Sequence, residues 1–177
     1  MPLSWTRSGR PVPPTIHPLS PEVYDGQWRQ GTNNQGAATF GTANRAIFFP
    51  FYLTEAATFV RAFVVNGATQ SGNIDIGIYD ANGIRLVSTG GTALSGATTT
   101  QSFTLSSTTL AGMTLYYLAM VVDNPSAIFA AAAFGSTRNL GSLMRTSSYP
   151  LPVDASSWVV NTFNTIPFFG IARTTAF

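Results

Sequence analysis

The sequence predicts an all-β protein: a single jelly-roll-like β-sandwich with an extended, proline-rich N-terminal arm. Three observations predict this fold class. Short segments alternate between apolar and polar residues, turn residues separate these segments about every 8–15 residues, and no stretch longer than ten residues has the 3.6-residue period of an amphipathic helix. The 177 residues fit one domain, which at this size buries roughly 70% of the surface of its extended chain.

Residues 1–36 differ from the rest of the chain and predict an arm in front of a sandwich domain at 37–177. Five prolines fall between residues 11 and 21, and proline disfavours both helix and sheet interiors. Trp5, Tyr24 and Trp28 are interleaved with this proline run, and such side chains favour burial. The arm therefore packs on its own domain or docks on a neighbouring subunit, and Gly31 to Gly36 reads as a flexible joint.

The rest of the chain reads as strand, turn, strand. We expect strands near 45–53, 57–66, 74–79, 84–87, 102–106, 113–123, 142–146, 157–163 and 166–173. Pro50 predicts an edge strand or a bulge, because proline cannot donate a ladder hydrogen bond. Residues 89–100 read as a loop. The alanine-rich run 128–134 could be a helix by composition, but its short length favours a strand.

Asp80-Ala-Asn-Gly83 lies between two alternating segments and predicts a hairpin with a type I turn. In this prediction Asp80, Asn82 and Gly83 are structural turn residues, and Gly83 takes a positive φ. A calcium loop is the alternative for Asp80 and Asn82, but the spaced acidic ligands and the distal glutamate of such a loop are missing.

Segments 57–65 and 113–122 carry apolar side chains on both faces. A two-layer sandwich needs one apolar face per strand, so the second face must be covered by the arm, by a loop or by another subunit. With only 9% charged residues to keep a bare surface soluble, another subunit is favoured. The predicted subunit or particle contacts are Trp5, Tyr24, Trp28, Phe59, Phe63, Tyr116 and Met120.

The composition excludes several kinds of active site and of binding partner. The chain has no cysteine and no lysine, which removes thiolate zinc sites, cysteine nucleophiles and Schiff-base chemistry. Its nine arginines are scattered and its net charge is +2, whereas nucleic-acid binding requires a clustered basic face. No apolar run suits a signal peptide or membrane insertion.

No catalytic or metal site is predicted, and no cofactor. His17, the single histidine, lies among prolines without an orienting partner nearby in the sequence. Asp80, Asp123 and Asp154 occupy turn positions, where aspartate has a structural role. Exposed aromatic side chains could instead stack on sugar rings, with Trp28, Tyr52, Tyr149 and Trp158 as candidates.

Four short motifs carry a resemblance to a known family. They are an opening strand at 43–53, Thr58-Phe-Val-Arg61, Ile76-Gly-Ile-Tyr-Asp80 and Tyr116-Tyr-Leu-Ala119. Through them the chain resembles, from about Gly41 to Asp123, a β-sandwich domain that recurs in virion proteins of tailed bacteriophages. The hairpin departs from the family's pattern, because the family often has a longer Gly-Pro loop there.

The resemblance implies a non-enzymatic virion structural protein, most simply a capsid decoration or other particle-surface protein. Its partners would be other copies of itself, a trimer being one option, and other virion proteins. The alternative function is a receptor- or carbohydrate-binding module of the tail-fibre type, which would bind a host surface glycan. No nucleic acid and no membrane are expected as partners. The family carries no catalytic motif, so no active residue is implied.

Overall fold

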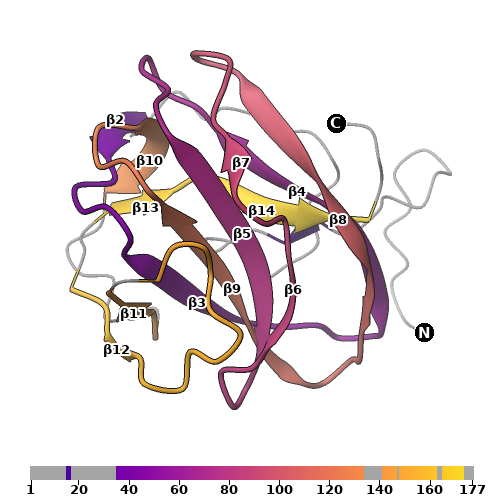
Figure 1. Ribbon diagram of the computed structural model, residues 1–177. Coiled ribbons are helices and arrows are strands. Elements are labelled where there is room, and N and C mark those ends of the chain that lie inside the picture. The colour runs from indigo at the N-terminus through magenta and orange to yellow at the C-terminus, as the bar shows by residue number, and fades with distance from the viewer. Residues whose placement is uncertain (1–14, 17–34, 134–140, 147, 163–164, 174–177) are drawn as a thin grey trace, which may run out of the picture.

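The computed structural model describes residues 15–16, 35–133, 141–146, 148–162 and 165–173, and in these ranges the protein is all-β (Figure 1). Most of the predicted arm, with Trp5, His17, Tyr24 and Trp28, lies outside the described residues. The strands are β1 (Thr15–Ile16), β2 (Gln35–Thr39), β3 (Ala46–Tyr52), β4 (Ala57–Val65), β5 (Asn73–Asp80), β6 (Arg85–Ser88), β7 (Thr92–Ala93), β8 (Thr100–Leu110), β9 (Leu115–Val122), β10 (Ile128–Ala133), β11 (Leu143–Arg145), β12 (Val159–Val160), β13 (Thr165–Pro167) and β14 (Phe169–Ala172).

Two antiparallel sheets face each other and form the predicted β-sandwich. One has the strand order β1-β14-β4-β8, and the other has the order β12-β11-β3-β9-β5-β6, with β7 pairing to β5. The jelly-roll comparison uses eight of these strands, numbered 1 to 8 in chain order: β1, β3, β4, β5, β6, β8, β9 and β14. In these numbers the first sheet has the order 1-8-3-6, and the second has the order 2-7-4-5. This interleaving of two Greek keys is a jelly roll, so the predicted fold class is confirmed.

A third sheet, β13-β10-β2, lies at one end of the sandwich, at the upper left of Figure 1. The alanine-rich run is its central strand β10, so the strand interpretation of that run is confirmed. Strand β2 includes Gln35 and Gly36, which the sequence analysis placed in a flexible joint. The other residues of that joint lie outside the described residues, so the boundary at residue 36 stays a prediction.

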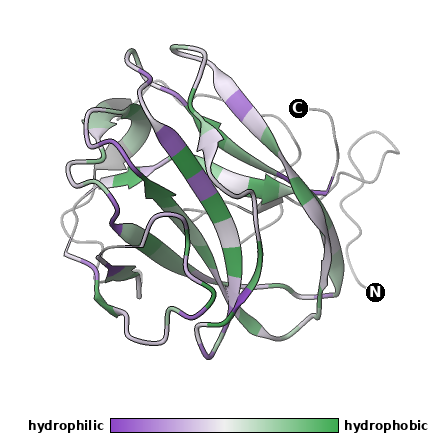
Figure 2. Ribbon diagram, in the orientation of Figure 1, coloured by the Kyte–Doolittle hydropathy of each residue, from purple (hydrophilic) through white to green (hydrophobic). Residues whose placement is uncertain are grey.

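The main core fills the space between the two large sheets. Isoleucines of β5 point into it, and the alternation of apolar and polar residues along that strand is visible in Figure 2. The neighbouring strand β9 contributes Tyr116, Leu118 and Met120 to the same core.

No helix in the described part of the chain is long and apolar enough to cross a membrane.

Strand β4 departs from the predicted alternation because its ladder with β8 is irregular. Phe59 pairs with Thr108 but Arg61 pairs with Thr104, so the register shifts between them. The shift places Phe59 in the same core as Ala62 and Val64. Regular alternation along 57–65 would place Phe59 and Phe63 on the same face, but the shift separates them, since an irregularity within a strand changes which residues face inward.

The hairpin between β5 and β6 confirms the turn prediction. Gly83 has a φ of +83°, and its N–H donates to the Asp80 carbonyl over 3.1 Å. The Asp80 side chain accepts from the N–H groups of Asn82 and Ile84, each over 2.9 Å. The carboxylate is thereby committed to the turn.

Pro50 lies inside β3, where it pairs with Tyr117 of β9. On the other side of β3, β11 pairs only with residues 46 to 48. β3 therefore lies between β11 and β9 at its first residues, whereas at Pro50 it pairs only with β9 among the described strands. This explains how a proline fits there.

Candidate functional site

The outer face of the six-strand ladder β12-β11-β3-β9-β5-β6 is covered by the chain's own residues 148–158, which we call the covering segment. Leu151 and Ala155 of this segment pack in a second apolar cluster with Phe48, Tyr79 and Ala119. Tyr149 and Trp158 pack against the same cluster. The covering segment therefore gives the sheet an apolar layer on each side.

Hydrogen bonds fasten the covering segment to the β5–β6 hairpin. The Asp75 carboxylate accepts from the Leu151 N–H over 3.0 Å, and the Arg85 guanidinium donates to the Leu151 carbonyl. The Tyr79 hydroxyl donates to the Pro152 carbonyl over 2.6 Å. Further along, the Ala155 N–H donates to the Gly83 carbonyl over 2.8 Å.

Asp75 is the buried carboxylate at the centre of this contact, with no exposed surface. It also accepts from the hydroxyls of Ser88 over 3.3 Å and Thr89 over 3.2 Å. Burial raises the pKa of Asp75, while these hydrogen bonds and the nearby Arg85 act in the opposite direction. Its acceptor positions are thus used to hold the covering segment, which is a structural role.

The other described aspartates also have structural partners. The Asp154 carboxylate accepts from the Ser156 N–H over 2.8 Å. Hydrogen bonding by the Ser156 side chain, and after it this backbone bond, lowers the pKa of Asp154. The Asp123 carboxylate accepts from both the backbone and the side chain of Asn73, each over 2.7 Å. In the described ranges no three His, Cys, Asp or Glu side chains gather as a metal site.

Tyr117 and Trp158 pack together where the covering segment ends, and Tyr52 lies near Tyr117 on the adjacent strand β3. We call these three side chains the aromatic patch. The rings of Tyr117 and Trp158 have centroids 4.5 Å apart, and Trp158 meets Phe48 edge to face at 5.3 Å. Tyr52 is 58% exposed. Desolvation, and to a smaller extent the neighbouring Tyr52 hydroxyl, raises the pKa of Tyr117. The patch is thus a partly wet aromatic surface with two phenol hydroxyls and an indole N–H.

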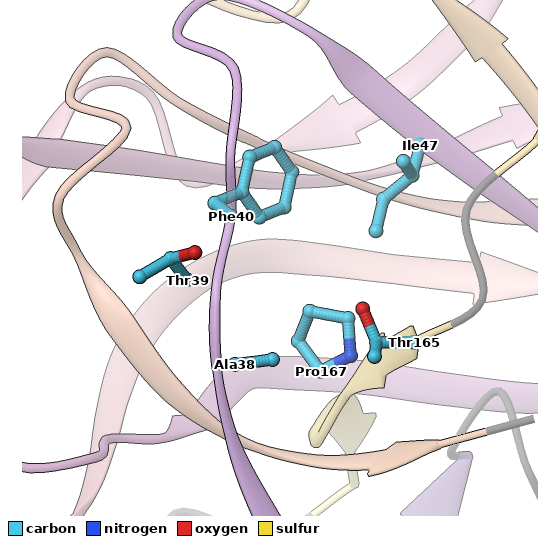
Figure 3. A pocket seen from close by; sticks show the side chains of 6 residues that line it. All are labelled: Ala38, Thr39, Phe40, Ile47, Thr165 and Pro167. Carbon is cyan, nitrogen blue, oxygen red and sulfur yellow. The ribbon is translucent and has the colours of Figure 1, made fainter.

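A small cavity lies between β2, β3 and β13, lined mainly by apolar atoms (Figure 3). Its volume is about 10 Å³, which is room for about one water molecule. Phe40 and Ile47 close one side, and Thr165 and Pro167 close the other. An organic ligand does not fit this space.

The predicted contact residues of the sandwich are not available on its surface. Phe59 and Met120 have no exposed area, Phe63 has 1%, and Tyr116 has 6%. Their assignment as subunit or particle contacts is therefore wrong for the folded chain. Three of the four, with Phe63 excepted, belong to the core between the sheets.

Two physical reasons explain this correction. Tyr116 and Met120 face the core between the sheets, and residues 148–158 cover the opposite face of β9, so a loop of the same chain does what a second subunit was expected to do. Phe63 lies on the other face of β4, opposite Ser102 of β8 and Gly170 of β14, and is buried there. The predicted contacts Trp5, Tyr24 and Trp28 lie outside the described residues.

Sequence reasoning missed the role of Asp75. The available signal was a carboxylate at the outward position of a strand whose neighbours on the same face, Gly77 and Tyr79, suit a covered surface. A charged residue in such a position requires a partner. That partner, Leu151, is 76 residues away in the sequence.

Comparison with known proteins found no matching family model, no matching curated protein and no matching solved structure. The functional argument therefore depends on the residues and geometry described above.

Proposed function

We propose that the protein is a non-enzymatic structural protein of a bacteriophage virion, displayed on the particle surface and assembled from several copies. The observation that carries this proposal is how the described polar groups are used. Asp75, Asp80, Asp123 and Asp154 each hold a turn or fasten one segment to another. Such a chain is built for shape and contact.

The exposed surface supports the same proposal. Charged residues make up 9% of the chain, and several large apolar side chains are exposed along the sheet that carries the covering segment. These are Tyr52, Ile84, Leu86, Met113, Val153, Val159 and Val160. A surface poor in charge is suited to contact with neighbouring proteins on a particle.

Locating the chain on particles tests this proposal. Antibodies raised against the recombinant protein are used to label phage particles released from cells that encode it, and the particles are imaged by electron microscopy. We expect label at regular positions on the particle surface. Recovery of the chain only in the soluble lysate, with unlabelled particles, would overturn the proposal.

A second candidate function is binding of a neutral host-surface saccharide, as in a receptor-binding module of the tail-fibre type. The specific observation in its favour is the aromatic patch Tyr52, Tyr117 and Trp158. Aromatic faces stack on the C–H faces of sugar rings, while phenol and indole groups hydrogen-bond to sugar hydroxyls. The three side chains are uncharged, which suits a neutral sugar.

A glycan array tests this second candidate. We expect retention of specific neutral glycans by the wild-type chain and at least about a tenfold loss in Tyr52→Ala, which corresponds to about 1.4 kcal/mol. Ile84→Ala is the matched control, because Ile84 is also exposed but lies in the β5–β6 hairpin. Equal retention by both variants, or no retention by the wild type, excludes the patch as a saccharide site.

A further inference from the structure

The outer edge of β8, which pairs with no second strand among those described, is the feature on which this inference depends. β8 is the longest strand described, with 11 residues, and it is the last strand of its sheet, paired with β4 alone among the described strands. An edge strand presents backbone N–H and C=O groups that can pair with a further strand. A long edge is therefore a template for sheet extension.

β8 also lacks two common protections of such an edge. Natural edge strands carry lysine, other charges or proline, which oppose pairing with another chain. Residues Thr100 to Leu110 contain no charged residue and no proline. Their exposed side chains are the hydroxyls of Thr100, Ser102, Thr104, Ser106, Ser107 and Thr109, and Figure 2 shows β8 as pale over most of its length.

The ladder with β4 shows which part of β8 is straight. Residues Thr100 to Thr104 pair in unbroken register with Val65 to Arg61. Beyond this stretch, three residues of β8 lie opposite the single residue Val60, so the strand bends. The five residues 100–104 are therefore the regular part of the edge.

We propose that β8 pairs edge to edge with β8 of a second copy of this chain, through residues 100–104. Two identical strands related by a two-fold axis run antiparallel, which is the geometry of a regular ladder. The two four-stranded sheets then become one continuous sheet. A second copy suits this edge because a two-fold pairing places identical residues near each other, and residues 100–104 bring no like charges together.

This inference concerns how copies associate, and it can fail independently of the proposed function. Location on the particle is measured by imaging, whereas pairing through β8 is measured on the purified chain. A chain found on particles without β8 pairing would retain the proposed function and lose this inference.

Oligomeric state is the first test, measured by light scattering after size exclusion on the full chain. We expect the wild type to become dimeric at about 200 µM, and Ser102→Lys to weaken association at least about tenfold, because like charges then face each other across the axis. Ser157→Lys is the control: Ser157 is also exposed but lies in the covering segment. A wild type that stays monomeric, or equal association in both variants, overturns the proposal.

Cross-linking is the second test and does not depend on how Ser102→Lys folds. The chain has no cysteine, so one introduced thiol reports on one position. Ser102→Cys with a bismaleimide spanning about 8 Å should give a covalent dimer, since facing and diagonal side chains on paired strands lie about 5–8 Å apart. Ser157→Cys should give none. Cross-linking of both variants to the same extent indicates random collision and overturns the proposal.

Discussion

The outer faces of the two large sheets differ in their side chains and in whether the chain itself covers them. On the sheet that contains β9, apolar side chains point outward, and the covering segment seals them under Leu151, Ala155 and Trp158. On the other sheet, β8 points the hydroxyls of Ser102, Thr104 and Thr109 outward, and they remain exposed. We call this surface the hydroxyl face; Phe63 of β4, which lies beside Ser102 on it, is buried. The difference teaches that apolar residues on both faces of a strand require a cover but do not tell whether the cover comes from the same chain or from another.

The two faces also differ in how far their hydrogen bonds are buried. On the covered face, the bond from the Leu151 N–H to the Asp75 carboxylate is buried, and the bond from Arg85 to the Leu151 carbonyl is partly buried. On the hydroxyl face, the 2.7 Å bond between Thr58 and Thr109 and the 3.0 Å bond from Arg61 to Thr104 are exposed. We therefore expect substitutions on the covered face to change stability far more than those on the hydroxyl face.

Gly83→Val should have the largest effect, because it loosens the covering segment at its attachment to the hairpin. Gly83 has a φ of +83°, and an added Cβ would lie 2.9 Å from the Ser156 backbone nitrogen. Backbone strain and this clash together should lower the free energy of unfolding by about 4 kcal/mol, measured by urea denaturation. Ala81→Ser, at an exposed turn position, is the control and should be nearly neutral. If Gly83→Val unfolds at the wild-type midpoint, the attachment is not as described.

Leu151→Ala should have the second-largest effect and lower the free energy of unfolding by about 3 kcal/mol. Leu151 is 1% exposed in the second apolar cluster, so its truncation leaves a cavity. Leu86→Ala is the matched control: Leu86 is 44% exposed and should lose less than about 0.5 kcal/mol. Thermal unfolding followed by circular dichroism measures both variants. Equal losses in the two would show that the covering segment contributes no packing energy.

Asp75→Asn should reveal a smaller, pH-dependent effect. Burial raises the pKa of Asp75 in the folded chain, so the folded state favours the protonated form more than the unfolded state does. The corresponding stability is present below the unfolded pKa of about 3.9 and is lost as the pH rises through the folded pKa. Relative to the wild type, Asp75→Asn should therefore gain stability as the pH rises through that window. Denaturant unfolding at several pH values measures this, and a pH-independent difference would contradict it.

Thr58→Ala, on the hydroxyl face, should have the smallest effect. It removes the hydrogen bond to Thr109, which lies at an exposed position, and water can replace the lost partner. We expect the free energy of unfolding to change by less than about 0.5 kcal/mol. A loss above about 2 kcal/mol would show that the two faces contribute alike to stability.

The parts of this fold that the sequence predicts are the local ones. The turn at Asp80 and Gly83 is encoded within four residues, and the period-two pattern of 74–79 is visible without knowledge of any partner. The covering segment was not predicted, because residues 148–158 have no regular period and their partners are more than 60 residues away. The side-chain orientation in β4 could not be predicted for another reason, because no residue type indicates the register shift after Phe59.

For the candidate site, sequence reasoning named Tyr52, Tyr149 and Trp158 as aromatic candidates without grouping them. The structure brings Trp158 onto Tyr117, with Tyr52 nearby, and packs Tyr149 against the second cluster instead. Tyr117 was not singled out, because a tyrosine within an apolar strand reads as core. Its partial exposure depends on where the covering segment stops, which only the tertiary structure shows.

The order of the covering segment in the chain has a consequence for synthesis. The strands β3, β5, β6 and β9 of the face that it seals are complete once residue 122 has been made, whereas the seal ends at residue 158. The 36 residues between them take about 2–7 s to translate at roughly 5–20 residues per second. During that interval the outward residues Tyr117, Ala119 and Val121 have no cover. The newborn chain therefore passes through a stage at which it is prone to aggregate, and synthesis of residues 148–158 ends that stage.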